Sequence, residues 1–344
     1  MVELDLIINK TMEYLQFPSV VGNEKPFLDK LEKDFKSLQL TTKLYPGLLA
    51  VQGKKPNSAI VSAHIDRHGL IANGKGELEY AAYRVKNETA KVVINPKDKM
   101  WEKIVARFNH QKVYAYDAKT GEKLGAGTIN KCCVCSIRNN FVFEVPELSQ
   151  LTEGTPVSFS TNCNDASHTI DGQLDNVVSA ALGFTLFKFG FEGTLLLTKG
   201  EEIGESWKHI YDYFKDNKTE TKKLFVLDTS PFQLDESVDM NAVILRNRDN
   251  NAHFESVLTE TIKEKCEALK IPFLVKDEYI LSNAKTTNIG NTELGHLISK
   301  SNNQISGTTV QIATMGYHSN HEIANYEAIQ NVFKILSETL IPTP

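Results

Sequence analysis

Cysteine is scarce in this chain, with five residues among 344, and the number is odd. Small secreted proteins held together by disulfides carry a dense, paired set, so that class is excluded and reduced thiols are expected. Cys132, Cys133 and Cys135 lie close together, but Cys163 is the only other cysteine nearby, so no four-thiolate zinc site is available locally. We therefore predict that this segment is a β-strand with small buried side chains.

Long apolar runs and clusters of basic residues are also missing. No apolar run approaches the length of a membrane span, and segment 1–7 carries acids where a signal peptide would carry Lys or Arg. The net charge is −5 with both signs interspersed, which argues against nucleic acid or an anionic membrane as a partner. With 41% hydrophobic and 24% charged residues, the composition is that of an ordinary globular protein, and we expect a cytoplasmic location.

The chain divides according to the rhythm of its expected elements. Helix-like and strand-like segments alternate over residues 1–70 and again over 161–344, whereas residues 71–160 contain short strand-like runs separated by turns rich in Gly, Asn, Asp and Pro. We therefore predict an α/β fold in which a mixed, largely parallel sheet is flanked by helices. The first and last segments would form one split catalytic domain, and the middle segment would form an inserted small β-barrel-like domain.

Acidic and imidazole side chains follow several of the expected buried strands. Glu201 and Glu202 come just after an apolar run, and two adjacent carboxylates there can point different ways, one to a metal ion and the other to water. His64 and Asp66 follow another such run. Because residues two apart share a face of an extended segment, Asp66 can accept the proton on the second ring nitrogen of His64.

Three further residues fit the same pattern. Asp228 ends one apolar run, His318 follows another, and Asp175 precedes a helical stretch, where it could cap the helix or bridge two ions. Open α/β sheets bind ligands outside the carboxyl ends of their strands, so these distant residues are expected to meet at one rim. Each alone has a structural explanation, as a core histidine, a helix cap or a surface charge, but the five places together favour a metal site.

Two other histidines leave alternatives open. His321 lies three residues after His318 and could be the ligand in its place, although it is further from the strand. His68 could line the site beside Arg67 and contact substrate, but nothing in the sequence establishes this.

Five short motifs, in their order along the chain, resemble the co-catalytic metallo-aminopeptidases that include the glutamyl aminopeptidases and the tetrahedral, or TET, peptidases. The motifs are His64-Ile65-Asp66, Leu174-Asp175-Asn176, Glu201-Glu202-Ile203-Gly204, Asp228 and Tyr317-His318-Ser319, with a long insertion after the first. The resemblance spans nearly the whole chain and implies a zinc-peptidase-like fold.

The resemblance also implies how metal ions would be held. Asp175 would bridge two ions, while His64 and Asp228 complete one site and Glu202 and His318 complete the other. Three carboxylates and two imidazoles suit Zn, Co or Mn, so two divalent ions per subunit are expected.

Two residues would act without holding metal. Asp66 would orient His64. Glu201 would be the general base, taking a proton from the attacking water and passing it to the departing amine. The implied function is therefore a metal-dependent aminopeptidase that hydrolyses N-terminal residues from peptides.

The resemblance further implies assembly into a homo-oligomer, as a dimer formed through the inserted domain or as a tetrahedral dodecamer. In such an assembly the inserted domain would serve oligomerisation or substrate access. Peptides are the expected substrates, and neither nucleic acid nor membrane is an expected partner.

The chain departs from the family pattern near the site. Arg67 and His68 stand where the family has an acid and an apolar residue, and a cation beside two metal ions is unexpected. The other departures are Asn176, Lys199, Gly200, Trp207, Glu293 and Met315. Two alternatives therefore stay open: a dinuclear metal-dependent amide deacylase or carboxypeptidase, although those enzymes place their extra domain later in the chain, and a catalytically inert binding homologue.

Overall fold

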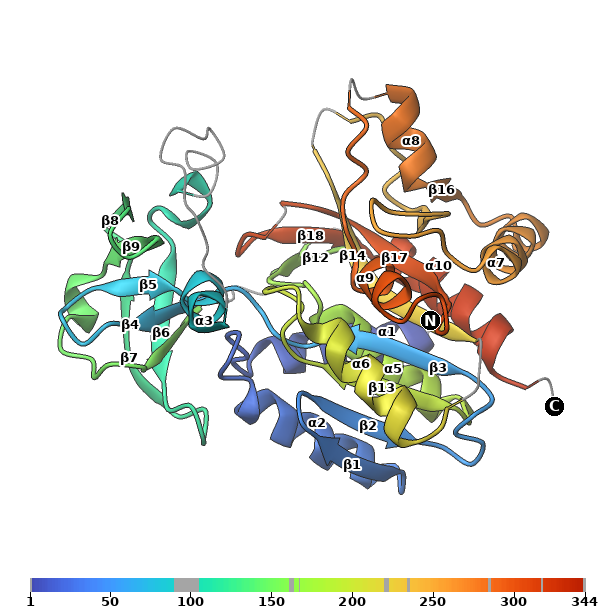
Figure 1. Ribbon diagram of the computed structural model, residues 1–344, viewed down its shortest axis with the longest axis horizontal. Helices are drawn as coiled ribbons and strands as arrows, with labels where there is room; N and C mark the ends of the chain where they lie inside the picture. The colour runs from blue at the N-terminus through green and yellow to red at the C-terminus, as the bar shows by residue number, and fades with distance from the viewer. Residues whose placement is uncertain are drawn as a thin grey trace.

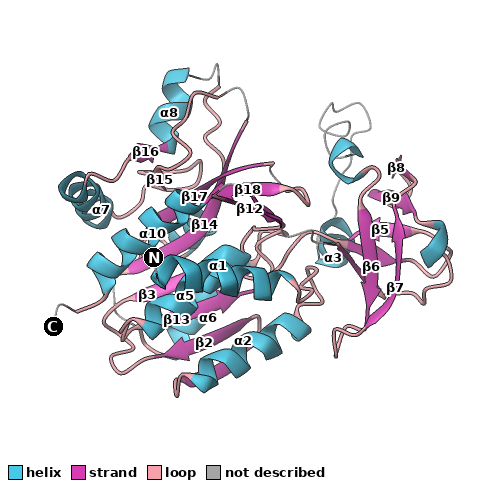
Figure 2. Cartoon of the chain, turned by 180° about the vertical axis from the view of Figure 1, so that it is seen from behind, coloured by secondary structure: helices cyan, strands magenta, loops and turns pink. Residues whose placement is uncertain are grey.

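Two separate β-sheets form the described part of the chain, one of eleven strands and one of seven. The computed structural model describes residues 2–89, 105–160, 164–166, 168–219, 223–233, 236–283, 286–316 and 318–342. The larger sheet carries most of the helices, and the smaller sheet stands to one side of this main body (Figures 1 and 2). The predicted α/β fold with a second β unit is confirmed, while the predicted domain limits stay a prediction.

The larger sheet has a parallel centre. Its strands are β1 (Thr41–Tyr45), β2 (Leu48–Gln52), β3 (Ile60–His64), β11 (Asn164–Ala166), β12 (Thr169–Gly172), β13 (Thr194–Thr198), β14 (Leu224–Phe232), β15 (Val243–Leu245), β16 (Phe273–Val275), β17 (Thr308–Met315) and β18 (Glu322–Asn325). They run in the order β1-β2-β13-β3-β14-β17-β18-β12-β11, with β15 and β16 branching from β17. Strand β3 is parallel to β13 and β14, and β14 is parallel to β17. The carboxyl ends of these four strands therefore face one edge.

Helices cover both faces of the larger sheet. They are α1 (Val2–Leu15), α2 (Lys25–Ser37), α5 (Val177–Lys188), α6 (Ser206–Asp216), α7 (Ser256–Leu269), α8 (Lys276–Asn283), α9 (Glu293–Lys300) and α10 (Tyr326–Leu340). Leu195 and Leu197 of β13 pack in one core with α1, α2, α5 and α10, whereas Leu196 packs in another core with α6 and α9. Successive strand side chains point to opposite faces, so this run of leucines is buried on both sides.

The smaller sheet has its own core. Its strands are β4 (Leu70–Ala72), β5 (Leu78–Tyr80), β6 (Lys112–Tyr116), β7 (Lys123–Thr128), β8 (Lys131–Cys135), β9 (Asn140–Glu144) and β10 (Pro156–Phe159), accompanied by helix α3 (Ala81–Thr89) and the 3₁₀ turn η1 (Pro146–Leu148). The described pairings give an open order, β7-β6-β10-β4-β5-β9-β8. Buried aromatic rings fill the core, and the rings of Phe108 and Phe159 stack 4.9 Å apart. The smaller sheet thus buries apolar surface independently of the helices on the larger one.

Several elements differ from the sequence-based expectation. Strand β14 does not end at Asp228 but continues to Phe232, because β17 pairs with it along this whole stretch after β3 has ended. Asp175 does not cap α5: the N-cap is Asn176, which makes no side-chain capping bond.

The cysteine-rich segment is a strand, as predicted, but its side chains are not buried. Cys133 is exposed, and Cys132 and Cys135 are half-buried. The reason is that β8 is an edge strand of the smaller sheet, so its neighbours cover it on one side only. Cys163 lies outside the described residues. None of the helices in the described ranges combines the length and the apolar character that crossing a bilayer requires.

Candidate metal centre

Six acidic and imidazole side chains from separate elements meet at the carboxyl edge of the parallel strands. His64 is the last residue of β3, and Asp228 lies in β14 directly after the stretch that pairs with β3. The others lie in connecting segments: Asp175 before α5, Glu201 and Glu202 after β13, and His318 after β17. The convergence expected from the strand-end pattern is therefore present.

His64, Asp175 and Asp228 form the first triad, whose donor atoms lie within 4.8 Å of one another. The Nε2 atom of His64 is 3.1 Å from Asp175 Oδ1 and 3.4 Å from Asp228 Oδ1. Burial opposes a charge on His64, but its hydrogen bonds to Asp175 and Asp228 prevail and hold its pKa well above the usual value. A cation placed among the three groups would take over the role of that proton.

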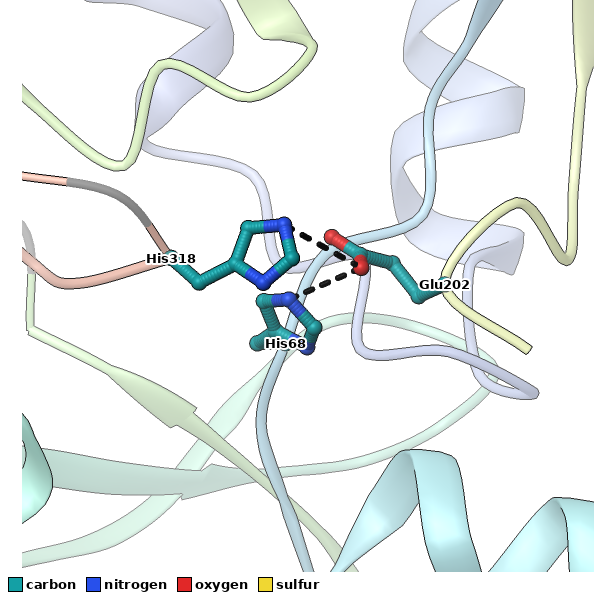
Figure 3. A group of neighbouring side chains, drawn as sticks. All are labelled: His68, Glu202 and His318. Carbon is teal, nitrogen blue, oxygen red and sulfur yellow. Dashed lines mark ion pairs between the residues drawn. The ribbon is translucent and has the colours of Figure 1, made fainter. Parts of the chain in front are cut away.

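His68, Glu202 and His318 form the second triad, which meets the same distance limit (Figure 3). The Nε2 atom of His68 is 2.8 Å from Glu202 Oε2, and the Nε2 atom of His318 is 3.9 Å from the same oxygen. Burial lowers the pKa of His68 to about 4 and that of His318 well below its usual value. Both imidazoles are therefore neutral near pH 7, which is the form that binds metal.

Asp175 belongs to the first triad and also faces the second. Its Oδ1 is 3.1 Å from His64 Nε2 in the first triad, and its Oδ2 is 3.6 Å from His318 Nε2 in the second. The backbone N–H of Asp175 donates to Glu322 Oε2 at 2.8 Å, which fixes the position of this residue. One carboxylate that turns an oxygen to each triad is suited to bridging two ions.

Asp66 holds the two glutamates through its carboxylate and the ring of His64 through its backbone carbonyl. Its carboxylate is 3.7 Å from His64 Nδ1, and it is the backbone carbonyl of Asp66 that lies within hydrogen-bond range of that atom, at 3.2 Å. Since a carbonyl can only accept, this bond places a proton on Nδ1 and directs Nε2 toward the acids. The carboxylate of Asp66 accepts the N–H groups of Glu201 and Glu202, both at 3.1 Å.

Glu201 belongs to neither triad. Its side chain lines a cavity of about 420 Å³, together with Asp175, Asp228 and His318. Burial raises the pKa of Glu201 well above the usual value, and Glu202 adds to the effect. A carboxylate with a raised proton affinity beside the cavity can accept a proton from a bound molecule.

Two cationic side chains, Arg246 and Lys276, also line this cavity. Arg246 donates from Nη1 to the carbonyl of Ile289 at 2.7 Å, and Lys276 donates from Nζ to Ser230 Oγ at 2.7 Å. Burial, followed by the nearby charge of Arg246, lowers the pKa of Lys276 to about 7. The cavity is therefore lined by acids, by the imidazole of His318 and by two cationic side chains.

Arg67 and Lys199, the cationic departures from the family pattern, direct their charges away from the triads. Arg67 is buried and donates to Ser19 Oγ at 2.7 Å and to the carbonyl of Phe17. Lys199 pairs with the buried carboxylate of Glu24 at 3.2 Å. Both side chains thus stabilise the segment that joins α1 to α2, and neither places its charge in the candidate metal centre.

Two other departures lie beside Glu201. Trp207 is half-buried on α6 and lines a smaller cavity of about 150 Å³ that Glu201 also borders. Glu293 is buried under the strand ends, where it accepts hydrogen bonds from Ser62 and Thr198, each at 3.1 Å, and burial raises its pKa. Both residues shape the surroundings of the triads without joining them.

His321 does not reach the triads. Its ring is half exposed and its Nδ1 lies 3.3 Å from Asp171, so of the two neighbouring histidines it is His318 that meets the acids.

The strand-end pattern did not indicate Glu322, because the antiparallel strand β18, and not a parallel one, brings it next to Asp175. His68 had a signal, since it lies four residues after His64 and thus on the same face as His64 and Asp66 if the segment is extended.

The side chains of the two triads fit divalent cations. Within the described residues, His68 Nε2 and Glu202 Oε1 are buried without a hydrogen-bond partner. Buried polar atoms are normally satisfied, and such a pair in a cluster of acids and neutral imidazoles suits a bound cation. His64, Asp175 and Asp228 could hold one ion, and Glu202 and His318 could hold another together with Asp175. The donor set suits Zn, Co or Mn.

Comparison with known proteins gives matches of fold. No protein-family model and no curated protein sequence matches the chain. Among solved structures, the TET1 peptidase of Pyrococcus horikoshii, which can assemble into a tetrahedron or a large octahedral shell, is 16% identical with a TM-score of 0.70, covering 98% of this chain and 100% of its own. The aminopeptidase APDkam598 of Desulfurococcus kamchatkensis is 15% identical with a TM-score of 0.73, covering 98% and 95%.

A third match carries a different name. The endoglucanase of Thermotoga maritima is 14% identical with a TM-score of 0.65 and covers 96% of each chain. At these identities the similarity establishes the fold and leaves the activity open. The described fold is thus that of the TET aminopeptidases over nearly the whole length of the chain, as the motif resemblance predicted.

Proposed function

We propose that this protein is a metal-dependent aminopeptidase that removes N-terminal residues from peptides through a dinuclear metal centre. The observation that carries the proposal is the position of Asp175, whose two oxygens face two separate ligand triads. Glu201 lies outside both triads but lines the same cavity, so a general base is available beside the ions. The fold shared with TET aminopeptidases supports the same activity.

Each group would have a separate task. His64, Asp175 and Asp228 would hold one ion, and Glu202 and His318 would hold the other together with Asp175. Two divalent ions, when bound, polarise a scissile carbonyl and lower the pKa of water.

Glu201 would move the proton in this reaction. Its carboxylate would take a proton from the attacking water and deliver it to the departing amine. Asp66 would keep Glu201 and Glu202 in register through the two backbone hydrogen bonds that it accepts.

The cations of the cavity indicate which N-terminal residues would be preferred. Arg246 and Lys276 line the same cavity as the acids of the first triad, and the ammonium group of Lys276 donates to Ser230 Oγ and to the Pro231 carbonyl. An aspartyl or glutamyl side chain could therefore be held by charge-assisted hydrogen bonds in this cavity. We infer a preference for acidic N-terminal residues.

Assembly and location are further parts of the proposal. The TET1 peptidase named above can assemble into a tetrahedron or a large octahedral shell, and this chain shares its fold over 98% of its length. A homo-oligomer, as a dimer or a tetrahedral dodecamer, is proposed on that basis. The cytoplasmic location expected from the sequence stays a prediction.

Competing functions differ in the bond they would cleave. An amide deacylase or carboxypeptidase could use the same two triads, and an endoglucanase shares the fold. Glycoside hydrolysis needs two carboxyl groups flanking the scissile bond and no imidazole ligands, so the histidines of both triads favour a peptidase. The alternative of an inert binding homologue rests on Arg67 and on the altered residues around Glu201, and of these Arg67 directs its charge away from the site.

The experiment that tests the proposal is the substitution Glu201→Gln. It should leave both ions bound but lower turnover of an aminoacyl substrate about 100-fold or more, the scale of losing a general base. The matched control is Glu205→Gln in the same loop, whose carboxylate pairs with Lys208 at the surface and should be dispensable. Turnover that is unchanged in Glu201→Gln would refute the assigned role of this residue.

A further inference from the structure

His68 lies in the short connection between the two sheets. It follows β3 of the larger sheet and precedes β4 of the smaller one. The side chain is 5% exposed, its Nε2 is 2.8 Å from Glu202 Oε2, and its ring centroid is 4.0 Å from that of His318. Figure 3 shows the two imidazoles turned toward the same carboxylate.

The contact between His68 and Glu202 is not a satisfied hydrogen bond. Despite the 2.8 Å separation, the Nε2 atom of His68 has no hydrogen-bond partner of acceptable geometry within the described part of the chain, nor has Glu202 Oε1. Burying such atoms unpaired is unfavourable. A cation that takes the Nε2 lone pair and a Glu202 oxygen would satisfy both residues.

Tyr80 orients His68 as an outer partner orients a metal ligand. Its hydroxyl is hydrogen-bonded to His68 Nδ1, and its ring stacks on the imidazole at 5.6 Å between centroids. The side-chain amide of Gln173 donates to the backbone carbonyl of His68 at 2.9 Å. When Nδ1 carries the proton and donates it to Tyr80, Nε2 is left with a lone pair that faces Glu202, the tautomer that a ligand requires.

The spacing of the donors is close to that around one ion. The donor atoms of His68, Glu202 and His318 all lie within 4.8 Å of one another. Bonds of about 2.0–2.2 Å to a zinc ion keep two donors no more than about 4.4 Å apart. Shifts of a few tenths of an ångström would therefore close the second triad around an ion.

We propose that His68 is a protein ligand of the second metal ion, in addition to Glu202, His318 and the bridging Asp175. The inference rests on the proposed metal centre and adds a nitrogen ligand at a position where the motif resemblance leads one to expect an apolar residue. The second site is then richer in nitrogen than the first. Because Tyr80 comes from β5, the smaller sheet also helps to hold this ion.

The test is a metal titration of chelator-stripped protein with Co²⁺, followed by calorimetry and visible absorption. The protein should bind two ions. In His68→Val the affinity for one ion should fall about tenfold or more, because loss of even an outer partner costs about 10–100-fold. The absorption of that ion should also change, while the other ion binds as before. Tyr80→Phe should weaken the same ion to a smaller extent.

The matched control is His321→Ala, which removes a half-exposed histidine outside both triads and should change neither affinity nor absorption. Wild-type affinities and an unchanged Co²⁺ spectrum in folded His68→Val would overturn the inference. A second measurement avoids variants altogether. X-ray absorption of the zinc-loaded protein should show three imidazoles shared by two ions, and only two imidazoles would contradict the assignment of His68.

These results separate the inference from the proposed function. If two ions bind with three imidazoles but no peptide is cleaved, the proposed aminopeptidase activity is refuted and the ligand assignment stands. If peptides are cleaved and His68→Val binds Co²⁺ like the wild type, the ligand assignment alone is refuted. If the wild-type protein binds no ion, both are refuted.

Discussion

The first triad combines one imidazole with two carboxylates, whereas the second combines two imidazoles with one carboxylate. Two members of the first, His64 and Asp228, lie on the parallel strands β3 and β14, which are fixed by neighbours on both sides. The second is built on connecting segments, and His318 adopts the left-handed backbone conformation with φ of 52°. Because Asp175 faces both triads, the two sites differ in the number of their imidazoles and in the rigidity of their support, and not in the number of their carboxylates.

This difference shows how two metal sites in one centre can differ in affinity and in preferred metal. Oxygen ligands favour harder ions such as Mn, whereas additional imidazoles favour Zn or Co. A site on paired strands is more precisely preorganised than a site on loops. We expect the two ions to bind with distinct affinities and, in mixtures of metals, with distinct preferences.

Asp175→Asn should weaken both metal sites and so remove the difference between them, since both depend on this residue. Each of its oxygens faces one triad, so the affinity for both ions should fall by on the order of 100-fold or more, beyond the cost of an outer partner. The measurement is metal content after gel filtration, together with Co²⁺ titration. Asp228→Asn provides the contrast and should weaken the first ion only. If Asp175→Asn lost a single ion, a bridging role would be wrong.

His318→Ala should increase the difference between the two sites, because it removes one imidazole of the second triad only. The second ion should bind about 10–100-fold more weakly while the first is retained, because His64 and Asp228 are untouched. Metal content is again the measurement, and His321→Ala is the control. Metal that is lost in His321→Ala but kept in His318→Ala would mean that the wrong histidine has been assigned.

The smallest expected effect is on substrate preference, and it comes from the titration of Lys276. This side chain lines the cavity together with Asp175 and Asp228 of the first triad. Its pKa of about 7 means that the ammonium group is charged below this pH and neutral above it. The ratio of kcat/KM for aspartyl over leucyl substrates should therefore decrease, by about three- to tenfold, as the pH rises from 6 to 8, the worth of one partly screened charge pair. Comparing two substrates cancels the titration of their shared α-amino group.

Lys276→Met should flatten this pH dependence and lower the ratio at pH 6. Leucyl substrates should be affected little, since they carry no charge for the lysine to bind. A ratio that is constant with pH in the wild-type protein would contradict the acidic preference assigned to this cavity.

The sequence predicted the parallel centre and its strand-end residues because both depend on local patterns. Buried runs such as 194–197 end where β13 ends, and Glu201 and Glu202 follow at the predicted edge. Asp228 was placed correctly in space although its strand continues to Phe232, since the pattern detects where β3 and its neighbours end and not how far β17 extends the pairing.

The remaining features depend on contacts between distant segments, which no local pattern contains. The carboxylate of Asp66 binds the loop of Glu201 because that loop folds back 135 residues later in the chain, and the sequence alone suggested the ring of His64 instead. Arg67 could not be recognised as harmless without its contacts to Phe17 and Ser19. No sequence pattern around His68 indicated its hydrogen bond to Tyr80, which comes from the smaller sheet.

The most direct test of the central claim is hydrolysis of a panel of free and N-acetylated aminoacyl and dipeptidyl substrates, with carboxymethyl cellulose as a glycoside control. The protein would be stripped with chelator and then supplied with Zn²⁺, Co²⁺ or Mn²⁺. The account predicts no cleavage without metal, and metal-restored cleavage confined to free N-termini and fastest for acidic ones. Cleavage of acylated substrates or of the glycoside, or no cleavage with any metal, would contradict it.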